Sequence, residues 1–171
     1  MSVATAVSHL LESEEMTQVQ MAMDLNLSEQ MISHIKNGRR KMAEDIAMAS
    51  IKKYDAPFYI MEITHEFADR CSPPVFRGSS VEKHRLAFEE TMINEAQQAI
   101  EILDEVSFVK SPQLVSREER QKVKEAIGEL LDVEAWAKNL VALLATEYNI
   151  SIKECYRNRI ATWKAKGWIE K

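Results

Sequence analysis

Residues 17–41 read TQVQMAMDLNLSEQMISHIKNGRRK, and this stretch predicts two short helices held at a fixed angle. Thr17 and Ser28 can each cap a helix, because a side-chain oxygen at that position accepts a hydrogen bond from a backbone N–H of the first turn. Ala22 is the small residue that two closely crossing helices need. Asn26 tolerates the positive φ of a tight turn better than most residues do. We therefore expect two helices joined by a short turn.

Apolar residues recur at helical spacing in this stretch and give each helix an inward side. Met21 and Leu25 are inward in the first helix, and Ile32 and Ile35 in the second. Asn37-Gly38 is a typical end for the second helix. Its outward side is polar and a basic run follows it, so this helix can lie in the major groove of DNA.

The outward residues of the second helix suit the edges of DNA bases. Gln30 suits adenine, and His34 or Ser33 suits the acceptors of guanine. Glu29 can accept from cytosine, although a carboxylate is also favourable at a helix N-terminus without DNA. The alternative for all four residues is an ordinary solvated helix face.

The stretch resembles the lambda-repressor/Cro-like, or Xre-type, helix-turn-helix family in its Thr-Gln start, its first-helix Ala, its small polar second-helix start and its Asn-Gly stop. Two positions depart from the family pattern: Asn26 stands where glycine is usual, and Lys36 where an acidic residue is frequent. The resemblance implies a DNA-binding domain of five helices: Ser2–Ser13, Gln18–Asp24, Ser28–Lys36, Met42–Tyr54 and Pro57–Phe67. The DNA-contacting residues expected from the motif are Gln18, Ser28, Glu29, Gln30, Ser33, His34, Asn37, Arg39 and Arg40.

Composition points to an all-α protein. The chain has 171 residues, of which 46% are apolar, with only four Gly and four Pro. It has no long apolar run and no charged-then-apolar leader, so we expect a cytoplasmic protein without a membrane partner. Cys71 and Cys155 lack any metal-binding spacing and are expected to be reduced. We find no pattern for catalytic residues, a metal or another cofactor.

The net charge of −5 is unusual for a protein that binds nucleic acid. Residues 1–60 contain six Lys/Arg and eight Asp/Glu, which gives −2, but four of the six positive residues lie between Lys36 and Lys41. This local cluster can contact phosphates while the acidic remainder weakens nonspecific binding. The charge distribution therefore favours sequence-specific binding to operator DNA over general coating.

The second half of the chain predicts a helical oligomerisation domain. We expect a DNA-binding domain at 1–70, a Pro- and Gly-containing linker at 71–80 and a three-helix bundle at 81–171. Leu86, Ile93 and Ile100 are seven residues apart and are expected to form the packing seam of its first helix. Three such helices have more apolar surface than they can cover, so we expect a homodimer or higher oligomer. A self-contained monomeric bundle is the alternative.

These patterns together predict a sequence-specific transcription regulator of the phage or prophage repressor type, and not an enzyme. One alternative is an anti-repressor or adaptor whose helix-turn-helix binds a regulatory protein. A second arises because Glu101 and Asp104 repeat the spacing of Glu129 and Asp132, which faintly resembles the metal-dependent MazG-type nucleotide pyrophosphatases. The basic, aromatic segment 153–171 is expected to dock on the bundle, with an accessory nucleic-acid contact as its alternative.

Overall fold

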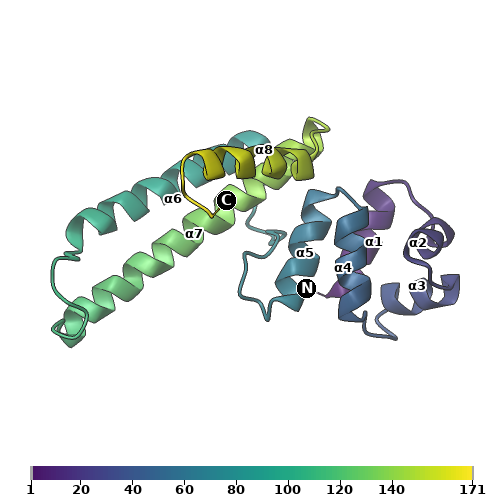
Figure 1. The fold of residues 1–171 in the computed structure, drawn as a ribbon, viewed down its shortest axis with the longest axis horizontal. Helices are drawn as coiled ribbons and strands as arrows, with labels where there is room; N and C mark the ends of the chain where they lie inside the picture. The colour runs from purple at the N-terminus through teal and green to yellow at the C-terminus, as the bar shows by residue number, and fades with distance from the viewer. Residues whose placement is uncertain (1, 171) are drawn as a thin grey trace. The chain divides into compact units, whose positions relative to one another are not determined.

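A computed structural model describes residues 2–170, and within that range all regular secondary structure is helical (Figure 1). The fold class is therefore all-α, as the composition predicted. The chain forms two compact units, Met1–Val75 together with Ala142–Lys171, and Phe76–Val141. The predicted ranges 1–70, 71–80 and 81–171 divide the chain at other points.

The N-terminal part of the first unit contains five helices, whose order and bounds agree closely with those expected from the motif. They are α1 Val3–Ser13, α2 Gln18–Leu25, α3 Glu29–Lys36, α4 Glu44–Lys53 and α5 Pro57–Phe67. Among these helices, α3 packs against both α1 and α2, and α5 packs against α1 and α4. Fully buried Val7, Leu10, Met21, Ile32 and Ile63 fill the space between them.

The turn between α2 and α3 has the local chemistry that the sequence predicted. Thr17 begins α2 with a reciprocal capping box, because its hydroxyl accepts from Gln20 N–H (3.2 Å) while Gln20 Oε1 accepts from Thr17 N–H (2.7 Å). Asn26 ends α2 with φ 54°, in the left-handed region. Ser28 then begins α3 by accepting from Met31 N–H (3.2 Å). These three predictions are confirmed.

The first unit also includes the last part of the chain. Within the predicted linker, Val75 is buried against Met61 and Ala142. The last helix, α8 (Ile152–Ala165), begins beside Asp55: Ser151 Oγ and Lys153 N–H both donate to its carboxylate. The start of α8 is therefore fixed to the corner between α4 and α5, whereas most of its remaining length is exposed.

The second unit is an antiparallel helical hairpin (Figure 1), formed by α6 (Arg85–Glu105) and by α7 (Arg117–Glu147) as far as Val141. A capping box begins α7, since Ser116 N–H donates to Glu119 Oε2 (2.7 Å) and Glu119 N–H donates to Ser116 Oγ (3.1 Å). Trp136 of α7 lies between two rings, with centroids 5.4 Å from Phe88 and 4.7 Å from Phe76.

The packing seam of α6 differs from the predicted one. Phe88, Ala99 and Val106 are the buried apolar residues of this segment. The predicted seam residues are instead exposed: Leu86 by 60%, Ile93 by 57% and Ile100 by 53%. The seven-residue spacing identified an apolar stripe correctly but assigned it to the wrong side of the helix.

Two further expectations concern membranes and thiols. None of the described helices combines the length and the apolar character needed to cross a membrane. Cys71 and Cys155 are both free and exposed, which agrees with the expectation of reduced thiols.

Candidate nucleic-acid interface

The outward side of α3 carries the four residues expected to meet bases. Glu29 and Gln30 are exposed, and Ser33 and His34 are half-buried. The opposite side of α3 is fixed in the core by Ile32 and Ile35, which are at most 2% exposed. Since these core contacts prevent rotation of the helix, the same polar residues always face outward.

The turn after α3 brings three predicted phosphate contacts together. Asn37 Nδ2 donates to Ser33 O at 2.8 Å, and the positive φ of Gly38 (68°) turns the chain. The backbone N–H groups of Arg39 and Arg40 both donate to His34 O, at 2.8 and 3.2 Å. The backbone here is thus closed by hydrogen bonds, while both arginine side chains are exposed.

The structure gives two of the predicted contact residues a local role as well. Asn37 ends α3 through its side-chain amide, and Ser28 begins α3 as its N-cap. Both remain exposed. Helix capping alone explains these two side chains, so they are the least specific members of the predicted set.

A shallow groove beside α3 brings Lys36, a basic residue absent from the predicted set, next to two predicted contact residues. Gln18, at the start of α2, lines this groove together with Glu29 and Lys36. Glu29 and Lys36 lie seven residues apart, which is two helical turns, and therefore share one side of α3. That spacing was visible in the sequence and could have placed Lys36 beside Gln18.

A cluster of carboxylates lies on the hairpin of the second unit. Ligand oxygens of Glu95, Glu129 and Asp132 lie within 4.8 Å of one another. The α6 residue that joins Glu129 and Asp132 is Glu95, and not Glu101 or Asp104 of the repeated spacing. Glu95 is the α6 residue at the level of Glu129, and position 101 lies almost two turns further along the helix.

Burial of the carboxyl group, followed by the negative charges of Asp132 and Glu129, raises the pKa of Glu95. The ionised form of Glu95 is therefore disfavoured in the folded protein and lowers the free energy of unfolding. This loss of stability is complete at pH values above the raised pKa and absent below the pKa that the group has in the unfolded chain. We expect Glu95→Gln to unfold at a higher temperature than the wild type at pH 7. The difference should shrink as the pH falls towards 4.

Thermal unfolding of both proteins across this pH range tests the electrostatic origin of the effect. Glu105→Gln is the matched control, because Glu105 lies on the same helix and is exposed. A Glu95→Gln variant that is less stable than the wild type at pH 7 would contradict the expectation.

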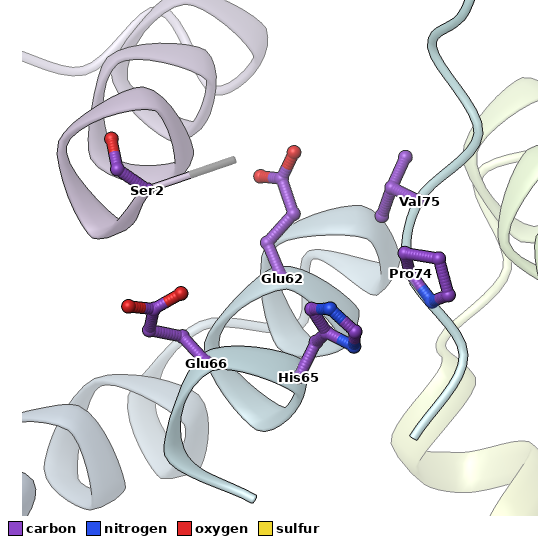
Figure 2. Close-up of a pocket in the computed structure, with 6 residues that line it drawn as sticks. All are labelled: Ser2, Glu62, His65, Glu66, Pro74 and Val75. Carbon is purple, nitrogen blue, oxygen red and sulfur yellow. The ribbon is translucent and has the colours of Figure 1, made fainter. Parts of the chain in front are cut away.

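The first unit has a small cavity between α1, α5 and the segment after α5 (Figure 2). Glu62 and His65 lie beside it, and the Glu62 side chain is only 2% exposed with Oε1 at 3.6 Å from His9 Nδ1. His65 Nδ1 is 2.6 Å from Ser72 O. Ligand sites commonly measure about 300–1,000 Å³, so this cavity of about 10 Å³ is far too small for a small-molecule ligand.

The chain matches no protein-family model, no curated protein and no solved structure. The resemblance to Xre-type regulators is therefore an inference from the sequence motif of residues 17–41 alone.

Proposed function

We propose that the protein is a sequence-specific DNA-binding regulator of the lambda-repressor/Cro-like type that reads operator DNA with α3. The observation that carries the proposal is the outward side of α3, where Gln30 and His34 precede an exposed arginine pair. Amide and imidazole groups can read base edges, and guanidinium groups favour phosphates. A phage or prophage repressor is the regulator that this arrangement fits best.

The support is both geometric and electrostatic. A recognition helix must be rigid, and core residues on one side of α3 with caps at both ends make it so. The basic residues must lie beside the helix and not on a distant face, and Lys36, Arg39, Arg40 and Lys41 meet this condition by sequence alone. Acidic residues elsewhere reduce nonspecific attraction to DNA.

The test begins with selection of binding sites from random duplex DNA by the full chain. At the selected site, Gln30→Ala combined with His34→Ala should weaken binding by about 1–3 kcal/mol per lost base contact, with nonspecific binding nearly unchanged. Gel-shift titrations on selected and scrambled duplexes measure both quantities. Equal affinity of the variant and the wild type for the selected site would reject the base-reading role.

Arg39→Ala combined with Arg40→Ala provides the contrast within the same experiment. Loss of phosphate contacts should weaken binding to both duplexes and reduce the salt dependence by about one counterion for each arginine. Lys52→Ala combined with Lys83→Ala removes an equal charge at two exposed positions outside the basic cluster and serves as the control. Failure of the selection, together with a stoichiometric protein partner, would favour the anti-repressor or adaptor alternative.

A further inference from the structure

Seven large aliphatic side chains are exposed on the α6–α7 hairpin. Each is at least 45% exposed. They are Leu86, Ile93 and Ile100 on α6 and Ile127, Leu130, Leu131 and Val141 on α7. Monomeric proteins rarely expose a contiguous apolar patch of this size.

The exposed aliphatic residues of α6 form one apolar stripe and those of α7 form a second, and both stripes lie on one face of the hairpin. Successive residues of a helix lie about 100° apart around its axis. In each helix the exposed aliphatic residues lie roughly 100–140° around this axis from the residues that contact the other helix. Followed along the chain, this rotation has the same direction in both helices. Phe88 and Ala99 mark the contact side of α6, and Ala126 and Trp136 mark that of α7. Because the helices are antiparallel, equal senses of rotation turn both stripes towards the same side.

We propose that a second copy of this chain covers this face, so that two hairpins form a four-helix bundle in which α6 of each copy packs against α7 of the other. A stable interface typically buries about 800 Å² on each partner, and these seven exposed side chains supply apolar surface for such an interface. Burial of aliphatic side chains supplies the driving force.

Charge at the edges of the face selects this arrangement. The outer edge of the α6 stripe carries Glu90 and Glu101, and that of the α7 stripe carries Lys124 and Lys138. Packing of α6 on α6 would place like charges together, which disfavours that arrangement. Packing of α6 on α7 of the second copy places each acidic edge against a basic one.

The charged edge residues also lie at matching heights along the hairpin, as a two-fold axis parallel to the helices requires. Phe88 contacts Trp136, and Glu95 lies beside Glu129, so the members of each pair lie at the same height along the hairpin. Any residue of α6 is therefore level with the α7 residue whose number, added to its own, gives about 224. Glu101 is therefore level with Lys124, and Glu90 is within about one turn of Lys138. An axis parallel to the helices preserves level, so these are the residues that meet between copies.

Two glutamates make one level of the interface unfavourable. Glu89 interrupts the α6 stripe and Glu134 interrupts the α7 stripe, and they lie at nearly the same level. The apolar contact is therefore centred on Ile93 and Ile100 of one copy against Ile127 and Leu131 of the other.

The connections of the hairpin also suit this axis. The chain enters the second unit at Phe76 and leaves it at Val141, and Phe76 N–H donates to Asn139 Oδ1 (2.8 Å), so both connections lie at one end of the hairpin. The proposed axis places these ends of both copies together, as two DNA-reading units on neighbouring half-sites require. This last argument rests on the proposed function, whereas those from area and charge do not.

A charge exchange tests the proposal on the full chain without DNA. Glu90→Lys with Glu101→Lys makes both edges basic, and Lys124→Glu with Lys138→Glu makes both edges acidic. At low salt, light scattering coupled to size-exclusion chromatography should give a dimer for the wild type, a monomer-shifted mass for each variant, and a recovered dimer for their equimolar mixture. Gln98→Lys with Gln121→Lys adds charge at two exposed positions on the opposite side of the hairpin, and this variant should remain dimeric.

Each opposite outcome overturns the proposal. A wild-type chain of monomer mass at micromolar concentration would mean that no second copy covers the face. Variants that both remain dimeric would place any dimer contact elsewhere. A mixture that stays monomeric would exclude packing of α6 on α7 between copies. Because mass is the readout, none of these results depends on whether the protein binds DNA.

Discussion

The full chain carrying Ile93→Lys and Ile100→Lys is expected to bind a DNA site with two half-sites about 10²-fold or more weakly than the wild type. Both isoleucines are more than half exposed on α6 in one copy. In the proposed bundle they are buried, where two ammonium groups without partners are costly. The variant should therefore be a monomer with an unchanged DNA-reading unit.

The size of the loss follows from effective concentration. When the first unit of a dimer binds, the second is held near its half-site, and dissociation of the dimer removes this advantage. Affinity for a single half-site should therefore remain at the wild-type value. Gln98→Lys with Gln121→Lys adds the same charge on the opposite side of the hairpin and should retain full affinity.

Fluorescence titration with one-half-site and two-half-site duplexes, alongside mass measurements, separates the two proposals. A monomeric variant that keeps full affinity for the two-half-site duplex would show that the hairpin serves a purpose other than pairing DNA-reading units. A wild type that is dimeric but binds no DNA would refute the proposed function and leave the proposed dimer intact.

The parts of this fold that depend on neighbouring residues could be predicted from the sequence. The capping boxes at Thr17 and Ser116 and the left-handed turn at Asn26 involve residues no more than a few positions apart. The bounds of the five helices in residues 1–67 were those implied by the resemblance to the helix-turn-helix family, and the structure agrees closely with them. The predicted DNA contacts stay predictions, since they concern a partner and not the chain itself.

The predictions that the structure did not match concern contacts between segments that lie far apart in the sequence. Apolar residues extend around more than half of α6, so spacing alone did not show that Phe88 faces α7 and Ile93 does not. Glu95 was missed for a related reason, because its meeting with Glu129 depends on the relative level of two helices. The contact of Ser151 with Asp55, 96 residues apart in the sequence, had no local signal.

Asn139 is the site of the second large expected effect. Its side chain is fully buried in the second unit, where Nδ2 donates to Ala135 O (2.9 Å) and Oδ1 accepts from Phe76 N–H (2.8 Å). Asn139→Leu removes the acceptor of a backbone N–H and should lower the free energy of unfolding by about 1–3 kcal/mol.

Asn139→Asp should be more damaging at pH 7, because it retains an acceptor but places a carboxylate at a fully buried position, which costs about 3 kcal/mol or more. Burial should raise the pKa of the introduced carboxyl group, so its charged form is disfavoured in the folded protein. The destabilisation should therefore be complete at neutral pH and should diminish as the pH falls through that raised pKa. Asn139→Leu has no ionisable group and should show no such recovery.

Urea unfolding monitored by Trp136 fluorescence measures these differences in the second unit, if Trp163 and Trp168 are replaced by Phe in every protein compared. Asn94→Leu and Asn94→Asp are the matched controls on exposed α6, where changes of about 0.5 kcal/mol or less are expected. An Asn139→Asp variant as stable as the wild type at pH 7 would mean that water reaches this side chain. The connection between Phe76 and α7 would then depend on the stacking of Phe76 on Trp136, and not on a buried amide.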